Sequence, residues 1–401
     1  MSALGYYFTG TGTWFFAWGI QSVIFAWLVT MVLHETPRMV GVAQMALLLP
    51  STILMLLGGS LADHYGGRRL VLVGHGLAAL VPLFLIFMIT SDQLTYAVMI
   101  IAAVCMGTSQ AVVTPARDGL LALVAEGRIQ RRVVQASMIQ FGVQMIGFLI
   151  ASVADLAGAE SVLAIQTLAL VAGMFAYKKL ETGFASGDSG AHITIAEIFK
   201  SISDGYASVR RSPSMRMVVV QNCAMGLFFM GSYIVTIPLI VREIYSGSST
   251  ELAYLNAANS LGLVITIMLL LRFGDIKRQG MALLLAQGIG CFFLAAAGLG
   301  MGFGLMLLAI FAWGICGGVA MTMSRTIMQE QSPENQRARM MAFYAFSFMG
   351  SGPLGALLNG FVADALGPEN ALIAASIMMF IIMILVALTS GLWQLNADLE
   401  T

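Results

Sequence analysis

The amino-acid sequence predicts an all-α integral membrane protein with twelve transmembrane helices in two six-helix pseudo-repeats. Hydrophobic residue types make up 59% of the 401 residues and charged types only 10%, whereas about a quarter of an ordinary soluble domain is charged. Twelve apolar runs are long enough to cross a bilayer, which takes roughly 20 residues. The basic residues fall into alternate loops between these runs. Together these observations predict a chain that is solvated mainly by lipid.

The runs follow one another closely except at the centre of the chain. A polar segment, residues 181–216, separates an N-terminal half, residues 1–180, from a C-terminal half, residues 217–401. After the capping pattern Thr194-Ile-Ala-Glu197, apolar residues recur at helical spacing. This pattern predicts an amphipathic helix, either on the cytoplasmic membrane surface or packed on the protein's own loops. The predicted spans are 12–33, 40–62, 70–89, 94–116, 133–154, 161–177, 217–241, 252–271, 281–299, 303–323, 340–363 and 371–393.

The distribution of basic residues predicts the orientation of the chain. With the amino terminus in the cytoplasm, the inward loops hold every Lys and Arg except Arg38 and Arg242. The acidic residues show no such sorting, as the positive-inside rule expects. A miscounted helix would invert every later loop and destroy the asymmetry. The pattern therefore predicts an even number of spans, with both termini on the cytoplasmic side of the inner membrane.

The two halves resemble each other in sequence. The octet Val153-Ala-Asp-Leu-Ala-Gly-Ala-Glu160 reappears 209 positions later as Val362-Ala-Asp-Ala-Leu-Gly-Pro-Glu369, after the fifth run of each half. Two acidic residues also repeat at an offset of 212, Asp63 with Asp275 and Asp118 with Glu330. Parallel six-helix repeats of this kind are an architecture of secondary transporters.

The strongest local motif lies between the second and third runs. Gly59-Ser-Leu-Ala-Asp-His-Tyr-Gly-Gly-Arg-Arg69 resembles G-x-L-A-D-R-x-G-R-R, the signature loop of the major facilitator superfamily. His64 and Gly67 depart from it, so either Arg68 or Arg69 supplies the basic residue. The resemblance implies a latch that forms and breaks as the two halves rock. Its residues here would be Gly59, Asp63, Arg68, Arg69 and Asp118, and in the weaker second copy Asp275, Lys277, Arg278 and Glu330.

Two stretches carry a finer resemblance. The first is residues 329–341, Gln-Glu-Gln-Ser-Pro-Glu-Asn-Gln-Arg-Ala-Arg-Met-Met, which continues into residues 350–360 and 363–367, and the second is residues 198–211 with Met215-Arg216 in the central segment. Together they resemble the enterobactin-exporter-like branch, which includes siderophore and drug efflux proteins. The resemblance implies export of a small amphipathic organic compound, driven by protons. The glycine–proline motif of many proton-coupled exporters is missing from residues 140–147, and this absence weakens the implication of antiport.

Polar and aromatic residues recur at helical spacing in the helices that line the central cavity of this superfamily. Such residues suit a bulky, partly apolar substrate, although the same stripes also occur in ordinary helix packing. The candidate cavity residues are Trp14, Trp18, Gln21, Phe25, Met106, Gln110, Gln144, Asn222, Met225, Phe229, Tyr233, Trp313 and Tyr344.

Several classes of chemistry leave no trace in the sequence. No acidic or basic residue falls near the middle of a predicted span, so proton coupling follows from the resemblance alone. His75 is the titratable exception, and we interpret it as a packing residue. No phosphate-binding loop, catalytic triad or metal-ligand pattern occurs, so we expect no enzyme activity, cofactor or metal.

We expect a monomer in the bilayer that handles a small molecule and protons and has no nucleic-acid partner. Three alternatives remain open at this point. They are a lipid or lysolipid translocator, an uncoupled facilitator or importer of a small metabolite, and a receptor or enzyme on a transporter scaffold.

Overall fold

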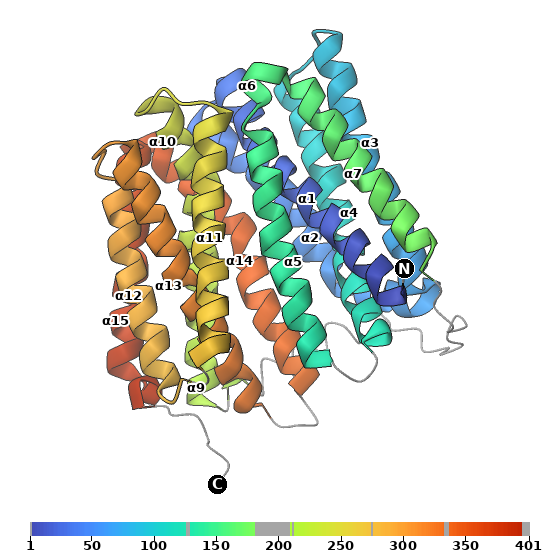
Figure 1. The fold of residues 1–401 in the computed structure, drawn as a ribbon. Helices are drawn as coiled ribbons and strands as arrows, with labels where there is room; N and C mark the ends of the chain where they lie inside the picture. The colour runs from blue at the N-terminus through green and yellow to red at the C-terminus, as the bar shows by residue number, and fades with distance from the viewer. Residues whose placement is uncertain are drawn as a thin grey trace. The chain divides into compact units, whose positions relative to one another are not determined.

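The computed structural model describes residues 2–125, 129–180, 209–210, 212–273, 276–332 and 337–394. These residues form α-helices with short π-helical and 3-10 segments, and no strand occurs among them (Figure 1). The predicted all-α class is confirmed. Most of the central segment, with its predicted amphipathic helix, lies outside the described residues.

The chain divides into two compact units. Unit 1 comprises Met1–Glu35, Ala46–Ile195 and Gly247–Ala257, and unit 2 comprises Thr36–Met45, Ala196–Ser246 and Ala258–Thr401. Two helices are shared between the units in this division, because α2 (Pro37–Tyr65) begins in unit 2 and α11 (Ser249–Phe273) begins in unit 1.

The remaining helices each belong to one unit. Unit 1 contains α1 (Ala3–Trp27), its π-helical continuation η1 (Leu28–Val32), α3 (Gly67–Thr90), α4 (Tyr96–Val124), α5 (Ile129–Ala151), α6 (Ala154–Ala157) and α7 (Ala159–Lys178). Unit 2 contains α9 (Pro213–Ala224), η2 (Met225–Met230), η3 (Ser232–Thr236), α10 (Ile237–Glu243), α12 (Gln279–Ala297), α13 (Phe303–Glu330), α14 (Arg337–Leu366), α15 (Pro368–Thr389) and the 3-10 turn η5 (Gly391–Gln394).

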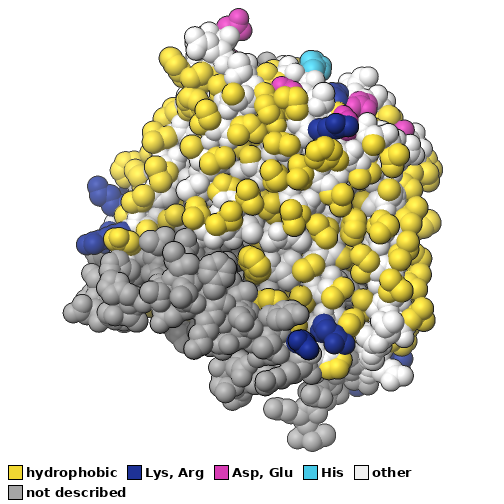
Figure 2. All heavy atoms as spheres, turned by 180° about the vertical axis from the view of Figure 1, so that it is seen from behind, with side chains coloured by type: hydrophobic (Ala, Val, Ile, Leu, Met, Phe, Trp, Pro, Cys, Tyr) yellow, Lys and Arg dark blue, Asp and Glu magenta, His cyan; other side chains and the backbone are white. Residues whose placement is uncertain are grey.

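Ten helices in the described part of the chain are long and apolar enough to cross a membrane, and the apolar stretch Gln135–Ala151 of α5 is shorter. One of the ten, Pro213–Glu243, joins α9, η2, η3 and α10 into a single span. Figure 2 shows a face covered largely by hydrophobic side chains, with the coloured charged groups toward the periphery of the part drawn in colour. This surface is typical of a protein surrounded by lipid. The count of twelve spans stays a prediction.

Close helix packing in unit 1 depends on glycine. A Cβ atom at Gly19 of α1 would lie 2.4 Å from the carbonyl oxygen of Gln144 in α5, and one at Gly147 would lie 2.3 Å from that of Phe16. Small residues allow backbones to approach in this way, and such contact is a main source of helix association in lipid.

The predicted end of the fourth span was wrong. We expected it to end at residue 116, with Arg117 in an inward loop, but α4 continues to Val124 and Arg117 is buried. The guanidinium is accommodated because it donates to Asp118 through Nε at 3.2 Å and Nη2 at 3.0 Å. Its Cζ also lies 4.6 Å from the ring centroid of Phe15, a favourable cation–π distance.

Candidate functional site

The predicted cavity residues of α1 lie in the helix packing of unit 1. Trp14, Gln21 and Phe25 are buried, while Trp18 is half-buried. Gln166 of α7 donates through Nε2 to Oε1 of Gln21 at 2.8 Å. This bond gives a buried amide the partner that it needs in an apolar interior. In this conformation, three of the four side chains therefore expose almost no surface to a solute.

His75 of α3 occupies the packing position that the sequence suggested. Its Nδ1 lies 2.8 Å from the carbonyl oxygen of Val71, and its ring lies 4.9 Å from that of Trp14 and 5.2 Å from that of Tyr177, centroid to centroid. The Tyr177 hydroxyl is 3.0 Å from Oγ1 of Thr11. The rings of α1, α3 and α7 thus share one buried layer.

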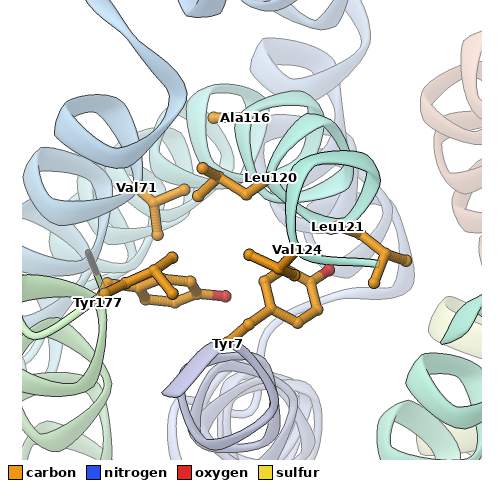
Figure 3. Packing of buried hydrophobic residues seen from close by; sticks show 8 residues of the cluster. Tyr7, Val71, Ala116, Leu120, Leu121, Val124 and Tyr177 are labelled. Atoms are coloured by element: carbon orange, nitrogen blue, oxygen red, sulfur yellow. The ribbon is translucent and has the colours of Figure 1, made fainter. Parts of the chain in front are cut away.

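A hydrophobic cluster continues from this layer toward the end of α4. In Figure 3 the ring of Tyr177 lies close to Val71 of α3, and the ring of Tyr7 lies close to Val124 of α4. Ala116, Leu120, Leu121 and Val124 contribute from α4. This cluster holds the ends of α1, α3, α4 and α7 together, so it is structural support for the site.

The predicted residues of α4 and α5 differ in exposure. Met106 is buried, whereas Gln110 and Gln144 are half-buried. Oε1 of Gln110 has no hydrogen-bond partner among the described residues. A buried acceptor without a partner is costly, so Gln110 is the residue in this set best suited to accept a hydrogen bond from a ligand.

Unit 2 brings several predicted residues into one cluster. The ring of Trp313 in α13 packs edge-on against Phe229 at 5.6 Å and lies 5.5 Å from Tyr233, centroid to centroid. Met225 precedes Phe229 by one helical turn and accepts a hydrogen bond from Nε2 of Gln287 at 3.2 Å through its sulfur. We call Met225, Phe229, Tyr233 and Trp313 the aromatic cluster. Met225, Phe229 and Trp313 are buried in this conformation and Tyr233 is half-buried. Their side chains are chemically suited to flat or branched apolar groups.

A polar network in the same unit joins α9, α13 and α14. Nδ2 of Asn222 donates to the carbonyl oxygen of Tyr344 at 2.9 Å and to Oγ of Ser347 at 2.8 Å. The Tyr344 hydroxyl lies 2.7 Å from Oγ of Ser324. Asn222 and Tyr344, which the sequence named as candidate cavity residues, are therefore hydrogen-bonded neighbours in the structure. Their contact with a substrate stays a prediction.

Sequence reasoning missed the partners of these residues. These partners are polar residues inside apolar runs, and that polarity was the only feature of the sequence that could have marked them. They are Gln166, Gln287, Ser324 and Ser347. A buried amide or hydroxyl in an apolar helix implies a partner on a neighbouring helix. The sequence does not say which neighbour, because that depends on how the helices pack.

The residues of the signature loop are only partly described. Gly59 and Asp63 fall within α2, but the side chain of Asp63 lies outside the described part of the chain. Arg68 donates through Nε to the carbonyl oxygen of Tyr177 at 3.1 Å and through Nη2 to that of Lys178, so it caps the end of α7. Asp118 is paired with Arg117, and Arg69 is exposed.

The second copy of the loop is also only partly described, and its contacts differ. Asp275 lies outside the described residues, and Lys277 and Arg278 are exposed. Oε1 of Glu330 accepts from Nε2 of Gln279 at 3.0 Å. The resemblance implies latch contacts in only one state of a cycle, so their role as latches stays a prediction for both copies.

No group of three or more His, Cys, Asp or Glu side chains among the described residues could hold a metal ion. The four cysteines are free thiols.

Comparison with known proteins decides the family. A family model described as transmembrane secretion effector, a major facilitator family, matches residues 7–400. The chain belongs to this family. It is a multi-pass membrane transporter and not an enzyme, and the resemblance drawn from the signature loop is confirmed.

Comparisons with individual proteins are consistent with this family assignment. The chain is 24% identical over 398 residues to the multidrug efflux pump Tap of Mycolicibacterium fortuitum, covering 94% of this chain and 93% of that protein. Its fold is similar to the nucleoside transporter NupG, with a TM-score of 0.71 at 13% identity, covering 97% of this chain and 99% of the other. A POT family transporter in complex with 5-aminolevulinic acid gives a TM-score of 0.74 at 13% identity over 98% of this chain and 96% of the other.

Proposed function

We propose that the chain exports small amphipathic organic compounds, drug-like or siderophore-like, across the cytoplasmic membrane. The match of residues 7–400 to a secretion-effector family carries this proposal. Similarity over almost the full length of a multidrug efflux pump supports the direction and the substrate class.

The side chains of unit 2 support the same substrate class. The aromatic cluster supplies apolar and aromatic groups, and the network around Asn222, three residues before Met225, supplies polar groups. These side chains are largely buried in this conformation, so the proposal requires that another state of the cycle exposes them. A ligand with an apolar body and a few polar groups matches this combination. A strongly charged ligand does not, because it would lose its hydration without gaining an opposite charge.

The transport cycle that we propose is alternating access, in which the binding residues face one side of the membrane and then the other. The energy source in this proposal is the proton gradient, and both termini lie in the cytoplasm. Residues of the two signature-loop copies would latch one of the two states.

Efflux from cells tests the substrate class. Cells lacking their own drug exporters would be loaded with a panel of fluorescent amphipathic dyes, and dye retention would be compared with and without the protein. We expect faster loss of at least one dye, abolished by a protonophore. Faster dye accumulation would instead indicate an importer, and selective movement of fluorescent lysolipids would indicate a lipid translocator. Unchanged retention of every dye, despite a properly inserted protein, would count against export of this class.

A further inference from the structure

The repeated octet contains one aspartate in each copy, Asp155 and Asp364, which stand 209 positions apart in the sequence. Neither aspartate belongs to the signature-loop latch or to the candidate substrate residues. In the structure each of them binds the start of a helix that is distant in sequence. Asp364 binds the start of α2, and Asp155 binds the start of α11.

Three contacts in unit 2 hold the start of α2 against α14. Oδ2 of Asp364 lies 2.6 Å from Nε of Arg38, and Cζ of Arg38 lies 5.3 Å from the ring centroid of Phe361. One turn further along α2, a Cβ atom at Gly41 would lie 2.9 Å from Cα of Gly360. The ion pair, the cation–ring contact and the backbone packing thus all act on the first turns of α2.

A different set of contacts in unit 1 holds the start of α11. Oδ2 of Asp155 accepts from the backbone N–H of Ser249 at 2.9 Å and from its hydroxyl at 2.7 Å. Oγ1 of Thr250 donates to the carbonyl oxygen of Ser152 at 2.8 Å. A carboxylate at the first turn of a helix satisfies a free N–H group and interacts favourably with the helix dipole.

The first turns of α2 and of α11, which the two aspartates bind, group with a different unit from the rest of each helix. Residues up to Met45 of α2 group with unit 2, and residues up to Ala257 of α11 group with unit 1. Each aspartate therefore retains a helix start whose remaining turns belong to the other unit. In the predicted topology both contacts lie on the external side, opposite the signature loops.

We propose that Asp155 and Asp364 are positioning residues of the transport cycle, each of which retains a helix start in one state and releases it in the other. This inference rests on the proposed transport function. The two retaining contacts differ in chemistry, because Asp364 forms a partly exposed ion pair and Asp155 caps a helix. In the structure both contacts of Asp155 and Asp364 are present. In the same structure Asp118, the acidic residue assigned to the signature-loop latch, forms an ion pair with the adjacent Arg117.

Hydrogen–deuterium exchange on the full-length protein in lipid nanodiscs tests the proposal without any substrate. We expect Asp364→Asn to speed exchange in residues 36–42 about twofold to fivefold, the range for loss of an exposed ion pair, with residues 249–255 unchanged. Asp155→Ala, which removes the capping oxygen, should speed exchange in residues 249–255 about twofold or more, with residues 36–42 unchanged. Arg38→Gln removes the partner of Asp364 and should repeat the effect in residues 36–42. Ser249→Ala removes one of the two hydrogen bonds to Asp155 and should have a smaller effect in residues 249–255.

Two controls separate positioning from general loss of structure. Glu243→Gln removes another ion pair, formed with Arg242 at 2.7 Å between neighbours on α10, and should leave both segments unchanged. The charge-swapped double variant, Arg38→Asp with Asp364→Arg, should restore protection of residues 36–42 and, once a transported dye is known, the wild-type transport rate. Unchanged hydrogen exchange in Asp364→Asn and Arg38→Gln, or no recovery of protection in a folded charge-swapped variant, would overturn the proposal. Because hydrogen exchange needs no transported compound, the exchange result is independent of whether the proposed substrate class is correct.

Discussion

Buried amides carry much of the polar chemistry inside the helices of this protein. Gln21 and Gln166 are joined by one hydrogen bond, and the other polar atom of each amide has no partner among the described residues. In lipid such a bond is worth about 0.6 kcal/mol on average and up to about 1.7 kcal/mol. Losing one partner also leaves the second amide buried and unpaired, which adds to the cost.

We therefore expect Gln166→Leu to lower the free energy of unfolding by about 1 kcal/mol. Gln21→Leu should have a similar effect, whereas the double variant should cost less than the sum of the two. A double-mutant cycle from unfolding titrations in bicelles measures this coupling. Strictly additive costs would show that the two amides do not stabilise each other.

Asn222 gives a prediction about binding. Its Nδ2 group is already occupied by Tyr344 and Ser347, so replacing it disturbs the network beside the aromatic cluster. We expect Asn222→Ala to raise the KM for an exported dye about tenfold, equivalent to about 1.4 kcal/mol. Gln221→Ala is the matched control, because it removes the adjacent buried amide of the same helix. Equal KM values for wild type and Asn222→Ala would contradict the assignment.

At the scale of the element, the span from Pro213 to Glu243 is unusual because it contains two π-helical segments, η2 and η3. A π-helical turn alters the local hydrogen-bond pattern and is frequent at functional sites. Nδ2 of Asn359 in α14 donates to the carbonyl oxygen of Leu227 at 2.9 Å, and Oδ1 of Asn359 accepts from Ser232 at 2.9 Å. One asparagine thus binds both π-helical segments to α14.

Packing of α5 on α1 gives a prediction at the same scale. A Cβ atom at Gly147 would meet the backbone of α1, whereas one at Gly142, also in α5, would meet nothing within 4 Å. We expect Gly147→Ala to lower the free energy of unfolding by about 1–3 kcal/mol through overpacking. Gly142→Ala should be neutral or slightly stabilising. Thermal unfolding of both variants in detergent checks the contrast, and equal melting temperatures would contradict the close packing.

The sequence predicted the helices better than it predicted their contacts. An apolar run identifies a membrane helix because solvation by lipid depends on the local composition of the run. The burial of Arg117 and the π-helical segments depend on neighbours that come from distant parts of the chain, and periodicity does not specify them. The cluster of Phe229, Tyr233 and Trp313 was partly predictable, because helical spacing places the first two on one face of their helix.

At the scale of the whole molecule, the signature loop gives a prediction about the cycle. The family resemblance implies that Asp63 takes part in a latch between transport states. We expect Asp63→Asn to reduce the transport rate at least about tenfold while leaving the amount of folded protein in the membrane unchanged. The measurement is dye efflux normalised to folded protein, determined by size-exclusion chromatography. Wild-type rates in this variant would refute the latch role.

The central claim is that the protein couples the outward movement of an amphipathic compound to the proton gradient. Purified protein would be reconstituted into liposomes, and uptake of a dye identified in the cell assay would be followed through the proteins whose cytoplasmic face is outside. We predict that an acidic interior drives dye accumulation above equilibrium, and that a protonophore abolishes it. Equilibration at the same rate with and without the pH gradient would contradict the claim, because it would show that the protein is an uncoupled facilitator.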